Sequence, residues 1–105
     1  MEDAETAYRV AIEADPKHYR AQNNLGVLLA SQGKFGEAVP HYLLAIAASS
    51  DYAPAYNNLG DALRAQGNLD AAIIAYTDAL RADPGFAEAS ESLASAKRES
   101  EGLHE

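Results

Sequence analysis

Apolar side chains recur three or four positions apart along most of this 105-residue chain, with polar side chains between them. This spacing places the apolar residues on one face of an α-helix. No segment alternates apolar with polar positions as a half-buried strand does, and β-branched residues are few. The pattern predicts an all-α fold with six helices, at residues 3–14, 19–31, 35–48, 53–65, 69–82 and 86–99.

Glycine and the dipeptide Asp-Pro mark the ends of the predicted helices. Gly33 and Gly67 follow two of them, where glycine adopts the left-handed conformation that ends a helix without steric cost to a Cβ atom. Asp15-Pro16 and Asp83-Pro84 end two others, because proline disfavours helical conformation in the residue before it. We call the helices at 19–31, 53–65 and 86–99 the inner layer, and the helices at 3–14, 35–48 and 69–82 the outer layer.

The helices belong to a repeat with a period of 34 residues. Asn23-Asn24-Leu25-Gly26 returns as Asn57-Asn58-Leu59-Gly60, and between residues 19–52 and 53–86 twelve of 34 aligned positions are identical. The alignment needs no gaps. A fixed period of this length is typical of arrays of helical hairpins that bury their apolar faces against one another.

The repeat resembles the tetratricopeptide repeat, a helix–turn–helix unit with a period of about 34 residues. The departures are Gln22, where the family prefers an aromatic residue, and Ser49-Ser50 in place of Asp-Pro. The resemblance implies a right-handed α-solenoid of about two and a half repeats and a C-terminal capping helix. The positions that carry it are Leu25-Gly26 and Leu59-Gly60, Gly33 and Gly67, Ala38/Tyr42/Ala45 and Ala72/Tyr76/Ala79, and the two Asp-Pro pairs.

We expect residues 1–105 to form one domain. Residues 1–18 would be the second helix of a truncated repeat, residues 19–52 and 53–86 two complete repeats, and residues 87–105 the capping helix with its tail. In the last helix Ser90 and Lys97 replace the apolar Tyr56 and Leu63 of the preceding repeat, as a polar terminal cap requires.

The first helix lacks an inner partner before it, so its apolar face is expected to be partly open. Two explanations remain: the chain is a fragment of a longer array, or this face is buried when the protein self-associates. The residues predicted to mediate self-association are Tyr8, Ala11 and Ile12.

The inner helices each place a second set of side chains away from the outer layer. Stacking would bring the three sets together as one concave surface, which is the predicted binding groove. Its predicted members are Arg20, Asn23, Asn24, Val27, Ser31, Asn57, Asn58, Asp61, Arg64, Glu91, Ser92 and Ser95.

The paired asparagines are the most informative members of this groove. Asparagine costs roughly 0.6 kcal/mol relative to alanine inside a helix, whereas its amide can both donate to and accept from a peptide group. One Asn per repeat could contact about every third residue of an extended segment. The alternative is that the amides bond to adjacent helices or turns, which applies most to Asn23 and Asn57.

Asn24 and Asn58 resemble the asparagine ladder of repeats of the O-linked N-acetylglucosamine transferase type, which implies contact with an extended peptide. A second subfamily clamps a terminal carboxylate with Lys, Asn, Asn, Lys and Arg. Only Asn58 agrees with that pattern, and an acidic residue would repel the carboxylate. The five places carry Asn23, Val27, Asn58, Glu88 and Ser92.

Composition excludes several function classes. Eight Lys and Arg against sixteen Asp and Glu give a net charge of −8, which disfavours nucleic-acid binding. Cysteine is absent, and His18, His41 and His104 are isolated in sequence, so we predict no metal site, no cofactor and no catalytic residues. No apolar run approaches the roughly 18 residues that span a bilayer, and with no signal peptide visible we expect a cytoplasmic protein.

The sequence thus predicts a non-catalytic scaffold that binds an extended peptide or protein segment in its concave groove. One alternative is a regulatory or substrate-recruiting segment of a larger enzyme such as a glycosyltransferase. The other is a self-assembly module that uses the open N-terminal end.

Overall fold

The computed structural model describes residues 3–103. It contains the six expected helices in the expected order, so the all-α prediction is confirmed within this range. The sixth helix extends to Leu103, beyond the predicted end at residue 99, because residues 100–103 contain no proline and the helix accommodates Gly102 in its last turn. The helices are α1 (Ala4–Ala14), α2 (Tyr19–Ser31), α3 (Phe35–Ala48), α4 (Ala53–Ala65), α5 (Leu69–Ala82) and α6 (Ala87–Leu103).

The turns within and between hairpins use different chemistry. Gly33 and Gly67 have φ angles of 78° and 82°, the left-handed conformation that a glycine allows at a helix end. The turns between hairpins instead pass through an extended residue, which is Asp15, Ser49 or Asp83. Ser49 therefore preserves this turn where the sequence departs from Asp-Pro.

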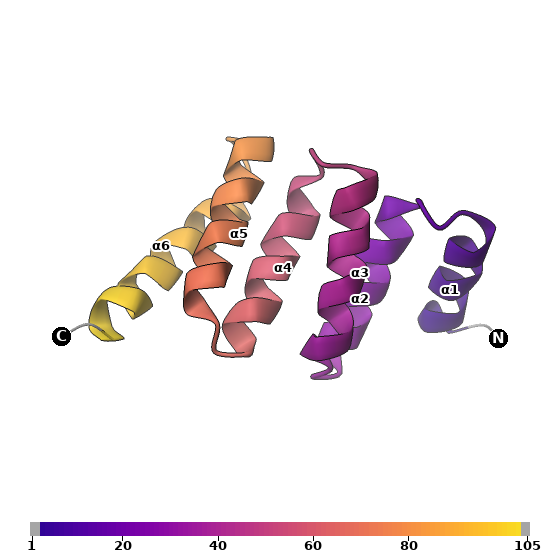
Figure 1. Ribbon diagram of the computed structural model, residues 1–105, viewed down its shortest axis with the longest axis horizontal. Helices are drawn as coiled ribbons and strands as arrows, with labels where there is room; N and C mark the ends of the chain where they lie inside the picture. The colour runs from indigo at the N-terminus through magenta and orange to yellow at the C-terminus, as the bar shows by residue number, and fades with distance from the viewer. Residues whose placement is uncertain (1–2, 104–105) are drawn as a thin grey trace.

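The helices stack side by side into an elongated molecule measuring 50 × 27 × 19 Å (Figure 1). The inner helices α2, α4 and α6 contact one another in sequence, whereas within residues 3–103 the outer helices α1, α3 and α5 do not. Each outer helix packs on inner helices instead. Closer spacing in the inner layer curves the stack toward that layer.

Each complete repeat has a core in which a tyrosine ring lies against a glycine. Tyr42 and Tyr76 are 2% and 0% exposed. A Cβ atom added to Gly26 would stand 2.5 Å from Cε1 of Tyr42, and one added to Gly60 would stand equally close to Cε1 of Tyr76. The repeated glycines and tyrosines are therefore two halves of one packing arrangement.

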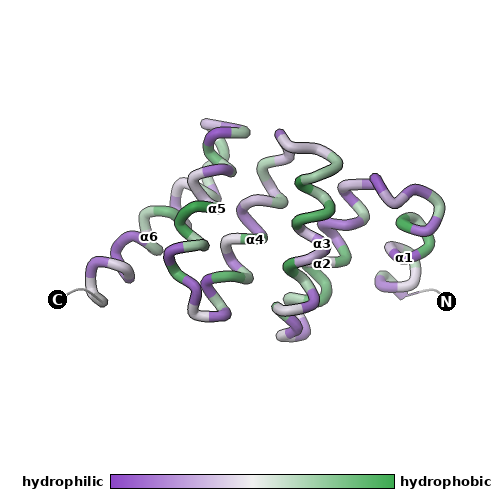
Figure 2. The backbone as a smooth tube through the Cα atoms, in the orientation of Figure 1, coloured by the Kyte–Doolittle hydropathy of each residue, from purple (hydrophilic) through white to green (hydrophobic). Residues whose placement is uncertain are grey.

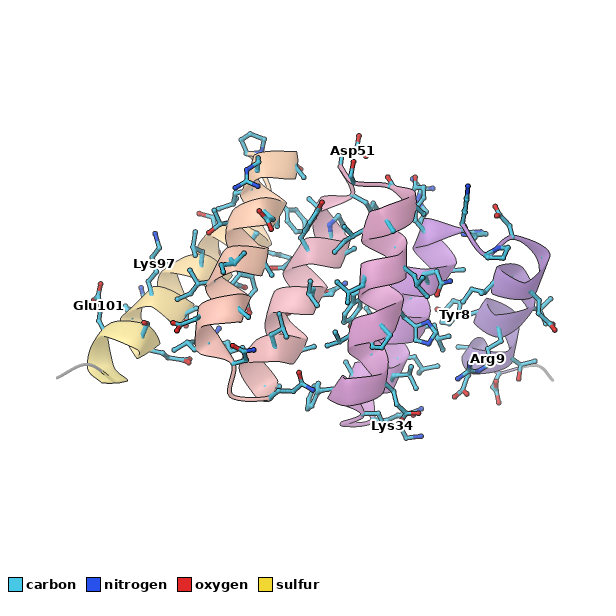
Figure 3. The ribbon with its side chains drawn as sticks, in the orientation of Figure 1. Tyr8, Arg9, Lys34, Asp51, Lys97 and Glu101 are labelled. Atoms are coloured by element: carbon cyan, nitrogen blue, oxygen red, sulfur yellow. The ribbon has the colours of Figure 1, made fainter. Side chains whose placement is uncertain are left out.

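The two ends of the stack differ. Tyr8 and Ile12 pack partly against the first core, and Tyr8 points from α1 toward α2 (Figure 3), although no residue of α1 is fully buried. At the other end, Ala96 is buried while Lys97 is exposed and points away from the other helices. Hydrophobic residues gather in α3 and α5, whereas the C-terminal part of α6 is largely hydrophilic (Figure 2).

Within the described residues, no helix combines the length and hydropathy needed to cross a membrane. His104, one of the histidines considered as a metal ligand, lies outside this range. Residues 3–103 contain no group of three side chains that could hold a metal ion.

Candidate functional site

The predicted groove residues fall into three classes of exposure. Arg20, Asn24, Val27, Ser31, Asp61 and Glu91 are exposed; Asn58, Arg64, Ser92 and Ser95 are half-buried; Asn23 and Asn57 are buried. The inner layer therefore presents most of these side chains to solvent.

Asn23 and Asn57 are each only 4% exposed, which corrects the expectation that their amides lie open on the groove. Both lie where neighbouring inner helices meet. Asn58 Nδ2 donates to Asn23 Oδ1 at 3.0 Å and so joins α4 to α2. One repeat later the position of Asn58 is taken by Ser92, whose shorter side chain does not continue the bond, and Asn57 Oδ1 is left buried without a hydrogen-bond partner among the described residues.

A hollow of about 290 Å³ opens between α2 and α4, with α3 beneath it. Most of its lining is apolar, and Asn58 and Asp61 bring polar groups to it. The apolar pattern places Phe35 and Tyr42 in the outer layer, so their position in this site was not predicted from the sequence. The lining residues are Val27, Ala30, Ser31, Phe35, Tyr42, Asn58, Asp61 and Ala62.

The equivalent region between α4 and α6 is occupied by a hydrogen-bonded cluster. The Tyr76 hydroxyl donates to Asp61 Oδ1 at 2.6 Å. Burial, followed by this bond, raises the pKa of Tyr76 to about 12. Arg64 donates to Ser95 Oγ at 2.8 Å and forms an ion pair with Glu99, which raises the pKa of Arg64. Arg64 is therefore engaged within the protein, and this part of the face is closed by polar contacts.

A second cavity, of about 400 Å³, lies beside α1 and is lined by Arg9, Ile12, Glu13, Leu25 and His41. His41 Nδ1 lies 2.8 Å from Gln22 Oε1, and Gln22 Nε2 donates to the Pro16 carbonyl at 3.1 Å. Because the Gln22 amide donates through its nitrogen, its oxygen accepts from His41, which therefore carries a proton on Nδ1. The departure from an aromatic residue at Gln22 thus creates a polar link between helices.

Comparison with known proteins identifies the family. The family model described as "Tetratricopeptide repeat" matches residues 18–84, more than half of the chain. The chain belongs to the tetratricopeptide repeat family. No curated protein sequence matches it.

Solved structures of tetratricopeptide repeat domains superpose on most of the chain. The first such domain of Spaghetti (RPAP3), bound to the HSP90 peptide SRMEEVD, has a TM-score of 0.86 and 27% identity over 96% of this chain and 78% of that one. The second domain of human RPAP3, in complex with the HSP70 peptide SGPTIEEVD, has a TM-score of 0.83 and 25% identity over 89% and 78%. A mutant O-GlcNAc transferase from Thermobaculum terrenum has a TM-score of 0.83 and 28% identity over 88% of this chain, but only 18% of that enzyme.

These findings confirm the predicted α-solenoid of tetratricopeptide repeats. Two of the similar domains are solved with bound peptides. Which residues of this chain contact a partner stays a prediction.

Proposed function

We propose that the protein is a non-catalytic scaffold that binds an extended peptide segment along the face formed by α2, α4 and α6. The observation that carries this proposal is the apolar hollow on that face, with the amide of Asn58 beside it. Apolar surface with a few convergent polar groups is the usual composition of a recognition site.

The asparagine amides supply the contacts to the peptide backbone. Asn58 uses one N–H to bond Asn23, which fixes its orientation and leaves a second N–H and the carbonyl oxygen for a ligand. Asn24 is exposed and offers a further donor and acceptor. Because a peptide group also carries one donor and one acceptor, these amides can bind a backbone regardless of its side chains.

The proposed partner is not the C-terminal carboxylate of a chaperone peptide. Of the three places where the clamp subfamily carries a cationic side chain, Asn23 and Ser92 bring no charge and Glu88 is an exposed carboxylate. Asn23 is buried and already accepts a hydrogen bond. A terminal carboxylate would find no cation at these places and would be repelled by Glu88.

An array of random 12-residue peptides tests the proposal. We expect the wild-type chain to bind a subset of peptides, and Asn24→Ala/Asn58→Ala to weaken that binding by roughly tenfold or more, since two hydrogen bonds contribute about 1 kcal/mol each. Thr77→Ala is the matched control, because Thr77 is exposed on α5 and bonds only its own helix. Unchanged binding by the double variant, with helical content intact, would contradict the groove assignment.

Asn58 also bridges two helices, so its loss could act through stability. The single variant Asn24→Ala separates the effects, because Asn24 is exposed and is not part of that bridge. We expect it to weaken peptide binding without lowering the unfolding midpoint in urea, which should be unchanged or slightly higher because alanine favours a helix over asparagine by roughly 0.6 kcal/mol.

A substrate-recruiting segment of a larger enzyme is the second candidate function. The observation favouring it is the superposition on the O-GlcNAc transferase from Thermobaculum terrenum. In that case the same face would present protein substrates to a catalytic domain outside these residues. The sequence flanking this segment in its gene tests the idea, since the candidate requires a catalytic domain there.

A further inference from the structure

The two complete repeats differ at one set of equivalent positions on the inner face. In the second repeat, Asp61 accepts the hydrogen bond of the Tyr76 hydroxyl and Arg64 lies beside them, bonded to α6. In the first repeat the equivalent positions, 34 residues earlier, carry Val27 and Ala30. A polar cluster in one repeat is thus an apolar hollow in the other.

This replacement leaves the hydroxyl of Tyr42 without its partner. Tyr42 is only 2% exposed, yet its hydroxyl makes no hydrogen bond to any other residue that the structure describes. Nor is it, within the described residues, among the unpaired polar atoms that are sealed from solvent, so the hydroxyl oxygen keeps some access to solvent. The Tyr42 hydroxyl is therefore available to a ligand that enters the hollow. A ligand that displaced water without forming a hydrogen bond to this hydroxyl would lose binding free energy.

The electrostatics of the hollow are negative. Asp61 lines the hollow while one of its oxygens is engaged by Tyr76, so its second oxygen remains for another donor. Burial raises the pKa of Tyr42 to about 12, with the charge of Asp61 as the second cause. The Tyr42 hydroxyl and the Asp61 carboxylate therefore lie close enough to bind the same ligand group. The net charge of the chain, −8, also favours a cationic ligand.

We propose that this hollow receives a lysine or arginine side chain of the bound peptide. The methylene stem would pack against Val27, Ala30 and Ala62, and the cationic head would donate to the Tyr42 hydroxyl oxygen and the free oxygen of Asp61. Long basic side chains combine an apolar stem with a charged tip in this way. An aliphatic side chain would leave the Tyr42 hydroxyl unpaired, and an acidic one would be repelled by Asp61. This proposal rests on the proposed function, since it assigns a specificity to the same face.

Selection of phage-displayed random 12-residue peptides on the full chain tests the specificity. We expect the selected peptides to share a Lys or Arg at one position, and its replacement by norleucine in a synthetic peptide to weaken binding about tenfold. In Asp61→Asn the difference between the basic and the norleucine peptide should shrink to less than about threefold. Asp70→Asn is the matched control, because this substitution removes the same charge from an exposed carboxylate that does not line the hollow. Asp70 lies in the first turn of α5.

A second variant transplants the polar cluster into the first repeat. Val27→Asp/Ala30→Arg reproduces residues that the second repeat already accommodates, so the chain is expected to remain folded. The new carboxylate would accept from Tyr42, and the new guanidinium would occupy the hollow beside Asp61. We expect this variant to lose at least about tenfold in affinity for the basic peptides.

The outcomes separate the two proposals. If peptides are selected and depend on Asn24 and Asn58, but norleucine binds as well as lysine, the basic specificity is wrong and the peptide-binding function stands. If affinity survives Val27→Asp/Ala30→Arg unchanged, the hollow is not the site. If no peptide is selected at all, both proposals fail.

Discussion

At the scale of single residues, the absence of a Cβ atom decides how each hairpin closes. Gly26 and Gly60 let the rings of Tyr42 and Tyr76 lie directly on the backbone of the inner helix. Both tyrosines are buried as a result. The Leu-Gly pair that identifies the repeat is therefore required for packing rather than for backbone flexibility, since both glycines have ordinary helical backbones.

Gly60→Ala should reduce the free energy of unfolding by about 1–3 kcal/mol, the usual cost of overpacking a core. The added Cβ would stand 2.5 Å from Cε1 and 2.7 Å from Cδ1 of Tyr76, so the buried ring must move. Urea unfolding followed by circular dichroism measures the change.

Gly36→Ala is the control for Gly60→Ala. Gly36 is exposed near the start of α3, and a Cβ there would meet nothing closer than Gln66 Nε2 at 3.9 Å. Alanine favours a helix over glycine by roughly 0.5–1 kcal/mol, so this variant should be neutral or more stable. Equal effects of the two substitutions would contradict the packing role of Gly60.

At the scale of elements, a polar chain ties three segments together near α1. Pro16 in the loop after α1, Gln22 in α2 and His41 in α3 are linked by two hydrogen bonds. Burial lowers the pKa of His41, the nearby Arg9 guanidinium lowers it further, and Glu37 on the same helix acts in the opposite direction. Glu13 lines the same cavity from α1.

We expect the stability of the protein to fall as the pH drops below the ordinary histidine pKa of 6.5. The folded state holds His41 neutral to a lower pH than the unfolded state does, so acid favours the unfolded chain. The loss should begin near pH 6.5 and level off below the lowered pKa of the folded state. Urea unfolding at a series of pH values measures it.

His41→Gln isolates the contribution of this side chain, because a glutamine amide can still donate to Gln22 and does not titrate. The other titratable groups are common to both proteins, so the difference in stability between wild type and variant reports on His41. A difference that is the same at pH 5 and pH 7.5 would contradict the assignment.

At the scale of the whole molecule, the two ends of the stack differ in which side chains they expose to solvent. Buried contacts in α6 come mainly from small alanines, and its outer side carries charged residues such as Lys97. α1 has no fully buried residue, and within residues 3–103 its backbone lies close only to that of α2. Tyr8, Ala11 and Ile12 are half-exposed there.

We propose that this α1 surface mediates self-association at high protein concentration. Sedimentation equilibrium should show an apparent mass that rises with concentration, and Ala11→Glu should reduce the rise by placing a charge on the surface. Thr6→Glu is the control, since Thr6 is exposed on α1 and not one of the three surface residues. A strictly monomeric protein at high concentration, with α1 ordered, would overturn this proposal.

The helices, their order and the repeat could all be predicted from the sequence. These follow from short-range causes: glycine at Gly33 and Gly67, proline after Asp15 and Asp83, and apolar spacing within each helix. Each acts within a few residues, so each can be recognised without knowing the packing. The 34-residue period then fixes which helices are neighbours.

The contacts of each inner-face side chain could not be predicted in this way, because they depend on how the helices pack. Asn24 and Asn58 occupy equivalent positions in the two repeats, yet Asn24 is exposed and Asn58 is half-buried and bonded to Asn23, because burial depends on the distance and angle to the neighbouring inner helix. The link from Gln22 to His41 and the hollow beside Tyr42 likewise depend on residues from different helices. Helix periodicity predicts the direction in which a side chain points. Packing between helices determines whether that side chain contacts solvent, a neighbouring helix or a ligand.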